Sequence, residues 1–545
     1  MKKHWFYFLI VSFLSISAFA QPQKPKLVIG IVIDQMRYDY LYRFWDKFSD
    51  NGFKKLMTKG FVCHNAQYNY MPTYTGPGHA SVYTGSTPAF HGIIANNWFD
   101  KNTRKLTYCV EDENVNTVGS KSDAGKMSPK NLLATTITDQ LRLATNFKGK
   151  VIGISLKDRG AILPAGHFAN AAYWFDGDKN GVFVSSTFYQ TSLPQWVKNF
   201  NKKGLPKQYI SKTWKTYYPI EEYSLFCAPD NNKYEGTFKG KAKPVFPYVL
   251  EELKDSNNYY SILKATPFGN TLVKEMAKAA IEGEKLGNDA ITDFLAISFS
   301  STDYVGHKFG PQSVELADTY IRLDLEITDL IQFLEQKIGK ENFILFLTAD
   351  HAAAYPPKYL SDKGYHINHL SEDQVFEIIN NKLKNKYNID SLLLSVYNQQ
   401  LYFDMDKVTQ NSLDLENVIE FVEEELIKIN GVYKVYSGED ILEMNKIPVL
   451  KNLILGYNQK MSGDVLYILK PGWLSTKYNT GTTHGSPYRY DTHVPLLFYG
   501  KNIPAGETYK QINITDIAPT LAALLKIQEP NACIGKVITP LLKSK

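Results

Sequence analysis

Long hydrophobic runs are nearly absent from this sequence. Residues 5–17 form one, and no other stretch approaches the roughly 20 apolar residues of a membrane span. The run follows a basic head, Met1-Lys2-Lys3-His4, and precedes Ala18-Phe19-Ala20, a small-residue cleavage pattern. We therefore predict a signal peptide over residues 1–20, no membrane anchor after cleavage, and a periplasmic or secreted location.

Cysteine is also scarce, with four in 545 residues and none in a C-x-x-C pair. We therefore assign no metal to cysteine. An even number in an exported protein suggests two disulfides, and free buried thiols are the alternative. The sequence does not choose among the three possible connectivities of Cys63, Cys109, Cys227 and Cys533.

Charge of one sign is not in excess either. The net charge of +6 is small and evenly spread, so we expect no nucleic-acid-binding module. Hydrophobic residues make up 44% and charged residues 21%, which is ordinary for a globular protein. There is no internal repeat or low-complexity tract. The length allows one large domain over residues 21–545 with insertions, and we expect a monomer.

Apolar, β-branched runs alternate with helical patterns along the chain. This alternation predicts an α/β fold, a doubly wound, mostly parallel sheet with helices on both faces. The main predicted strands are Leu27–Ile33, Val151–Ser155, Phe294–Phe299 and Phe343–Thr348, with Val465–Leu469 and Val494–Tyr499 as further members. The predicted helices include residues 131–145, 271–284 and 312–337.

Two segments interrupt this pattern and are predicted to be insertions. Residues 173–260 are rich in Tyr, Lys, Asn and Pro with weak periodicity, so we expect irregular surface structure near the site. Residues 370–460 show a helix, then strands, then an acidic helix. That order predicts a small α+β cap.

Charged side chains follow each of the four main predicted strands. In doubly wound sheets the working residues collect at the carboxyl ends of the strands. We therefore expect these side chains to meet at one edge of the sheet. In chain order they are Asp34, Lys157 with Arg159, Asp303, and Asp350 with His351.

Several of these residues are candidate metal ligands. Asp303 and His307 are four apart, so on a helix they share one face and can share a metal ion. Nitrogen and oxygen ligands without thiolate suit zinc and do not exclude manganese. Taken singly, each is equally compatible with a solvated aspartate or a structural histidine. The other candidates are Asp34, Asp350, His351 and His484, the last in a Thr-His-Gly-Ser loop.

Thr75 lies in the stretch Tyr74-Thr75-Gly76-Pro77-Gly78, which predicts a tight bend before a helical turn at residues 79–84. Backbone N–H groups and the dipole at a helix start favour an anion, and a hydroxyl held there can attack phosphorus if its pKa is lowered. The local alternative is an N-cap threonine in a Pro/Gly turn. Only the distant candidates favour the nucleophile.

Together with Thr75, this set resembles the alkaline phosphatase superfamily over almost the whole mature chain, from Asp34 to His484. The resemblance implies the superfamily's α/β fold, two zinc ions and a covalent phosphothreonine. It assigns to one zinc Asp34, Asp350, His351 and the nucleophile Thr75. It assigns to the other Asp303, His307 and His484.

Two branches of that superfamily are disfavoured. Sulfatases oxidise Cys or Ser to formylglycine within a C/S-x-P-x-R pattern, but the matching residues here are Thr75, Pro77 and His79. A secondary alcohol cannot give an aldehyde. The cofactor-independent phosphoglycerate mutases use a serine in the cytoplasm, which the predicted signal peptide contradicts.

The remaining choice lies between monoesters and diesters of phosphate. Asn96 matches an asparagine of both types. Lys157 and Arg159 are two apart, so on an extended chain both would point to one face and bind a dianionic phosphoryl group, unless they are an ordinary polar strand exit. With this pair the chain resembles the phosphate-irrepressible, threonine-nucleophile periplasmic alkaline phosphatases.

We therefore predict an enzyme that hydrolyses small-molecule phosphate monoesters over a broad substrate range, with secondary diesterase activity. Two alternatives remain. One is a nucleotide pyrophosphatase/phosphodiesterase, in which Lys157 and Arg159 serve another purpose. The other is a zinc-binding protein with a degenerate site.

Overall fold

The computed structural model describes residues 24–443 and 451–542. The predicted signal peptide, residues 1–20, lies outside this range. Within the described ranges no helix combines the length and apolar character needed to cross a membrane.

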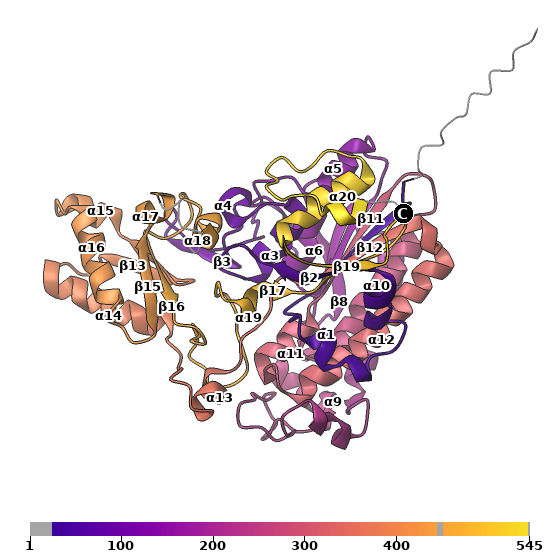
Figure 1. The fold of residues 1–545 in the computed structure, drawn as a ribbon, viewed down its shortest axis with the longest axis horizontal. Helices are drawn as coiled ribbons and strands as arrows, with labels where there is room; N and C mark the ends of the chain where they lie inside the picture. Colours follow the sequence, from indigo (N-terminus) through magenta and orange to yellow (C-terminus); the bar gives the residue numbers. More distant parts are fainter. Residues whose placement is uncertain (1–23, 444–450, 543–545) are drawn as a thin grey trace, which may run out of the picture.

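Five parallel strands form the centre of an eleven-stranded mixed sheet (Figure 1). Four of them match the predicted main strands, and they are direct neighbours, so the predicted α/β fold is confirmed. Towards both edges the strands pair antiparallel, except β19 (Gly506–Asn513), which pairs parallel with β2 (Phe61–Gln67). In spatial order the central five are β12 (Phe343–Thr348), β1 (Leu27–Ile33), β11 (Asp293–Phe299), β6 (Val151–Ser155) and β7 (Ala171–Asp176).

Of the two further predicted strands, one belongs to the main sheet and the other does not. Residues 494–499 do join the main sheet, as β17 (His493–Val494) and β18 (Leu496–Gly500). The prediction for β16 (Val465–Leu469) is wrong, because this strand pairs with β14 (Gln400–Phe403) and β15 (Val432–Ser437) in a separate sheet. All five residues of β16 are buried, so its sequence does not reveal which of the two sheets it belongs to.

Helices cover both faces of the main sheet, which explains why β1 is buried at every residue. α10 (Pro267–Glu284) and α12 (Val314–Lys337) pack together on one side. The other side carries α3 (Thr75–Thr84) and α6 (Asp158–Ala165), which pack against each other. α11 (Ser301–Phe309) follows β11 directly and joins it to α12.

The first predicted insertion begins later than expected. Tyr173 is already part of β7, which pairs with β8 (Val182–Ser186), so residues 173–186 belong to the main sheet. The rest of the predicted insertion, residues 187–260, is also more regular than predicted. It contains α7 (Gln195–Lys202), which packs against α10.

Residues 372–469 include a four-stranded antiparallel sheet with its own apolar core, which we call the cap (Figure 1, orange). α14 (Glu372–Tyr387) and α16 (Leu415–Leu426) pack on its strands. α14 starts at an N-cap serine, Ser371, whose side chain accepts from the Gln374 N–H while the Gln374 side chain accepts from the Ser371 N–H.

A two-stranded hairpin connects the main body to the cap. It consists of β3 (Asn97–Asp100) and β4 (Lys105–Tyr108). Its turn carries Lys101 and Arg104, which form ion pairs with two aspartates of the cap, Asp464 at 2.7 Å and Asp404 at 3.0 Å.

All four cysteine thiols are free, so the structure contains the alternative of unpaired thiols rather than the expected disulfides. Each lies in different surroundings: Cys63 in β2 (Phe61–Gln67), Cys109 just after β4, Cys227 beside Arg43 and Cys533 beside Gly85.

Candidate catalytic centre

Three candidate ligands meet where β1 and β12 end. Asp34 follows β1 directly, and Asp350 and His351 come shortly after β12. Because these strands are parallel neighbours, their carboxyl ends lie side by side. One ligand atom from each of the three side chains lies within 4.8 Å of the other two.

A second grouping forms beside the first, where α11 follows β11. Ligand atoms of Asp303, His351 and His484 also lie within 4.8 Å of one another. The His307 Nε2 is 3.1 Å from the Asp303 Oδ1, as their spacing on α11 predicts. The structure therefore brings all six proposed ligands together. The His307 side chain is 38% exposed, so the centre opens to solvent on this side.

The three histidines are held in the same tautomer. In each, Nδ1 lies 2.7 to 3.0 Å from a backbone carbonyl oxygen, which can only accept, so Nδ1 carries the proton and Nε2 stays free to bind a metal. The partners are Thr482 for His307, Thr73 for His484 and Ala352 for His351.

Thr75 is the first residue of α3 rather than a bend residue or an N-cap, since Tyr74 occupies the cap position. The prediction that the Gly-Pro-Gly stretch breaks the helix is wrong. Pro77 lies in the first turn, where a backbone N–H has no helical partner to lose. The Thr75 Oγ1 is 3.5 Å from the His351 Nε2 and buried.

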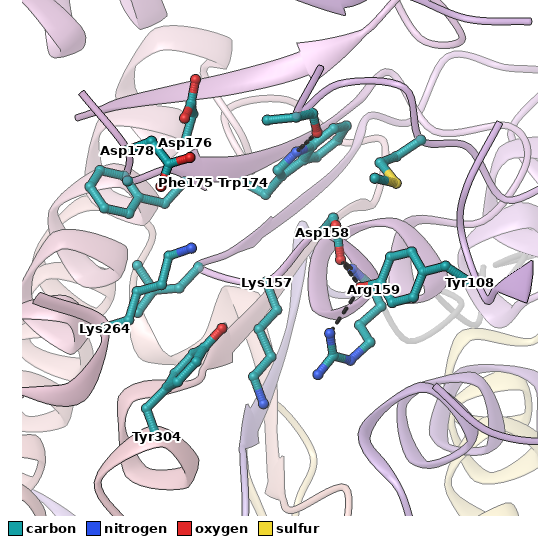
Figure 2. Close-up of a pocket in the computed structure, with 14 residues that line it drawn as sticks. Tyr108, Lys157, Asp158, Arg159, Trp174, Phe175, Asp176, Asp178, Lys264 and Tyr304 are labelled. Carbon is teal, nitrogen blue, oxygen red and sulfur yellow. Dashed lines mark hydrogen bonds between the residues drawn. The ribbon is translucent and has the colours of Figure 1, made fainter. Parts of the chain in front are cut away.

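Lys157 and Arg159 are not on an extended chain, because α6 begins at Asp158 and Lys157 is its cap residue. The charged ends of the two side chains still approach each other (Figure 2). The Lys157 Nζ lies 2.7 Å from the Asp34 Oδ2 and 2.6 Å from the Asp303 Oδ2, and it is 3.5 Å from the Thr75 Oγ1.

Arg159 has a different environment. One of its amino groups donates to the Tyr108 hydroxyl at 2.9 Å, and its buried Nε has no hydrogen-bond partner. A buried N–H without an acceptor is costly, so a bound anion beside Arg159 would satisfy it.

Asn96 lies beside the start of α3. Its side-chain oxygen accepts a hydrogen bond from the Gly76 N–H at 2.7 Å. This contact fixes the orientation of the amide, so its NH₂ group is available to a ligand next to Thr75.

The carboxylates of the centre carry uncompensated charge. Burial raises the pKa of Asp34 well above its usual range, and the Asp303 and Asp350 carboxylates add to the rise. Burial acts on Asp303 too, but His307 and Lys157 outweigh it and hold its pKa well below the usual range. Lys157 therefore pairs with two of the three buried carboxyl groups, Asp34 and Asp303, and His79 lies 3.4 Å from the third, Asp350.

The donor set fits divalent metal ions of the zinc type. The Asp34 Oδ1 and the Asp350 Oδ2 are buried without a hydrogen-bond partner, although both belong to the first grouping. Burial lowers the pKa of His484 well below its usual range, helped by His351 and His307, so its imidazole is neutral, as a ligand must be. A cation between these groups would satisfy the free oxygens and offset the surplus charge.

Sequence reasoning missed two residues that support the centre. Gln35 adopts a left-handed backbone (φ 67°), and its side-chain NH₂ donates to the Asp303 Oδ1 at 2.7 Å. His79 binds the Thr75 carbonyl oxygen through Nδ1 at 2.9 Å and the Ser298 hydroxyl through Nε2. The left-handed Gln35 has no local sequence signal, whereas the spacing of Thr75 and His79 on a helix could have indicated their contact.

Gly78 is required for the close approach of α3 to the ligand loop. A Cβ at this position would lie 2.2 Å from the Asp350 backbone oxygen. We expect Gly78→Ala to lower the free energy of unfolding by about 1–3 kcal/mol, because neither backbone can give way. Urea unfolding with an unchanged m-value would measure the loss.

Gly506→Ala is the matched control. A Cβ at Gly506 would meet only the Phe61 ring at 3.4 Å, an ordinary contact. Its effect should stay within about 0.5 kcal/mol. Equal stability of the two variants would show that α3 is not held against Asp350.

Comparisons with known proteins extend over nearly the whole chain. Residues 28–493 match the family described as type I phosphodiesterase / nucleotide pyrophosphatase. A Myroides odoratus protein named calcium-transporting ATPase is 48% identical, with 95% of this chain and 94% of that protein covered. Alkaline phosphatase PhoV of Synechococcus elongatus is 48% identical, covering 95% and 93%.

A solved structure is similar over the same extent. The crystal structure of wild-type alkaline phosphatase PafA has 45% sequence identity and a TM-score of 0.92. The match covers 95% of this chain and 99% of that one. The likeness therefore includes both the main sheet and the cap.

Proposed function

Because the chain belongs to the type I phosphodiesterase / nucleotide pyrophosphatase family, within the alkaline phosphatase superfamily, we propose that it is an alkaline phosphatase that hydrolyses phosphate monoesters. One observation carries the choice of monoesters: the Lys157 Nζ lies 3.5 Å from the Thr75 Oγ1, and a second cation, Arg159, is near Lys157. The transport activity in the name of the Myroides protein is not part of the proposal, because the catalytic centre accounts for hydrolysis alone.

The metal ligands divide into two sets in the proposal. Asp34, Asp350 and His351 would hold one zinc ion near Thr75. The second set is Asp303, His307 and His484. Two such ions supply Lewis-acid stabilisation of the attacking and leaving oxygens of an in-line displacement.

Thr75 provides the nucleophile. Its oxygen forms a bond to phosphorus while the bond from phosphorus to the leaving oxygen breaks, and the hydroxyl proton passes by way of solvent to the leaving oxygen, which departs as an alcohol. A water molecule then forms a bond to phosphorus and displaces the Thr75 oxygen, which takes up a proton from that water as inorganic phosphate leaves. His79 holds the Thr75 backbone in place through its hydrogen bond to the carbonyl oxygen.

Three groups would bind the phosphoryl oxygens. A monoester presents two negative charges there, whereas a diester presents one and a second organic group. Arg159 offers an unpaired buried N–H, Lys157 a point charge, and Asn96 an amide already oriented by Gly76. None of these contacts reaches the leaving group, which supports a broad substrate range.

The remaining parts of the proposal concern the setting. The signal-peptide pattern of residues 1–20 supports export to the periplasm or the medium, and we also propose that the enzyme is a monomer. Two zinc ions are proposed rather than one, since two groupings of ligand atoms, which share His351, lie together and His307 adds a sixth ligand beside Asp303.

A substrate panel tests the activity. We expect kcat/KM for an aryl phosphate to exceed that for the matched bis-aryl phosphate by at least about 100-fold, because one lost charge-assisted contact costs on the order of 2.7–4 kcal/mol in the transition state. Steady-state rates of the zinc-loaded enzyme on both esters and on an aryl sulfate provide the measurement. A preference for the diester would instead support a nucleotide pyrophosphatase/phosphodiesterase. Hydrolysis of none of them would support a degenerate zinc-binding protein.

A further inference from the structure

A second cluster of acidic side chains lies outside the catalytic centre, where residues 228–236 pack against the turn between α11 and α12. The Gly236 N–H donates to the Lys308 carbonyl oxygen at 2.8 Å, and the Ala228 N–H to that of Gln312 at 2.9 Å. The segment thus covers the turn that leads from His307 to Glu315.

Glu315 is a core member of this cluster. It lies in the first turn of α12 and is fully buried. One of its carboxylate oxygens accepts a hydrogen bond from the Tyr248 hydroxyl. The other, Oε2, has no hydrogen-bond partner.

Glu235 faces it from the covering segment. Its side chain is 6% exposed, and neither of its carboxylate oxygens has a hydrogen-bond partner. No described lysine, arginine or histidine pairs with Glu235 or Glu315. Burial, followed by repulsion from the Glu315 carboxylate, raises the pKa of Glu235 to about 10. Glu235 directly precedes Gly236, whose N–H holds the segment against the turn that leads to Glu315.

A shared proton is the alternative to a cation. A protonated Glu235 could donate to the free Glu315 Oε2, but the second oxygen of Glu235 would still be without a donor. Leaving such a group unsatisfied costs about 1–3 kcal/mol, and an ionised one costs more. A cation between the two glutamates satisfies both the charge and the free oxygens.

The donors around the two glutamates are mainly oxygen atoms, although the Cys227 thiol, whose pKa is raised by burial and by both glutamates, lies nearby. Asp230 and Asn232 are two apart, a spacing common in calcium-binding loops, and Asp230 adds to the repulsion on both glutamates. Among the described residues, the tight groupings of three ligand atoms are those of the catalytic centre, and the Asp230 carboxylate accepts from the Phe246 N–H at 3.2 Å. Oxygen-rich, flexible sites of this kind suit calcium rather than zinc.

We propose that Glu235 and Glu315 bind a calcium ion that fastens residues 228–236 to the turn between α11 and α12. The site is separate from the catalytic ligands but adjoins two segments that carry them. Besides its contact with Lys308, the covering segment contacts the loop that carries His484. The Tyr234 carbonyl oxygen accepts a hydrogen bond from the N–H of Gly481, which is three residues before His484.

Calcium binding to the full, zinc-loaded chain provides the test. At about 5 mM free calcium, above the dissociation constants of extracellular calcium modules, we expect one calcium ion per chain by elemental analysis. At fixed free zinc, calcium should raise the melting temperature by about 3 °C, since saturation stabilises only the folded state. Glu235→Gln should lose both effects, and Glu221→Gln, an exposed glutamate of the same insertion, should keep them.

Terbium luminescence provides a second readout that does not depend on activity. Tyr248 donates to Glu315, and the Trp214 ring lies 5.3 Å from the Tyr248 ring, so both can sensitise a bound terbium ion. Calcium should displace the terbium ion and so abolish the emission. The emission should also be lost in Glu235→Gln and in Glu315→Gln.

Wild-type protein that binds no calcium under these conditions would overturn the proposal, as would Glu235→Gln with unchanged calcium content. If Glu235 and Glu315 are instead held as a protonated pair, the wild-type protein should bind no calcium. If neither variant folds, a crystal of wild-type protein grown in calcium decides, because anomalous density is expected between Glu235 and Glu315 and its absence refutes the site.

Discussion

Thr75→Ala should lower kcat for an aryl phosphate by on the order of 10⁴- to 10⁶-fold, as removal of an attacking side chain does in other covalent hydrolases. The loss is large because no other hydroxyl replaces it at the start of α3. Steady-state rates on an aryl phosphate measure it, with zinc content determined on the same samples so that lost metal is not mistaken for lost chemistry.

Thr75→Ser is the matched control, since it keeps the hydroxyl and removes one methyl group. We expect it to retain activity within about tenfold, because the γ-methyl makes no bond to phosphorus. Acid-quenched samples should contain a phosphorylated residue in the wild type and in Thr75→Ser but not in Thr75→Ala. A Thr75→Ala enzyme with normal zinc content and activity near wild type would refute the nucleophile.

The second large effect concerns Lys157, which lies beside Thr75, and its neighbouring cation Arg159. Lys157→Ala/Arg159→Ala should lower kcat/KM for a monoester by about 10³-fold or more, and that for a diester by clearly less, because each charge-assisted contact is worth on the order of 2.7–4 kcal/mol and the diester carries one charge fewer. Parallel rates on the two esters measure the difference. Equal losses on both would show that the pair is structural.

The single variants separate binding from support of the centre. Lys157 also pairs with Asp34 and Asp303, so its removal disturbs the metal ligands as well as the substrate. Arg159 contacts Tyr108 instead, and Arg159→Ala is therefore the cleaner probe. Lys264→Ala serves as control, since Lys264 lines the same cavity opposite Arg159 (Figure 2) and should change either rate by less than about threefold.

The strands of the centre were predictable because buried parallel strands have continuous apolar sequences. β1, β6 and β12 match their predicted bounds, and the charged residue after each strand end was correctly placed at one edge. The same property explains the error at β16, since an apolar run fits the cap sheet equally well. Local pattern does not identify the neighbour of a strand.

Other features depend on contacts between distant segments. The first turn of α3 contains glycine and proline, and it is helical because Gly78 packs against Asp350. A Cβ on Gly306 would lie 1.9 Å from the Gln35 side-chain oxygen, so this glycine gives Gln35 access to Asp303. Neither approach is visible in the residues around one position.

The hairpin of β3 and β4 links the position of the cap to the groups proposed to bind substrate. Asn96 immediately precedes the hairpin and Tyr108, the contact of Arg159, ends it. The turn between them is fastened to the cap by Lys101 and Arg104. Any rotation of the cap must therefore break these ion pairs or transmit strain to both ends of the hairpin, and so to two of the groups that would hold a phosphoryl oxygen.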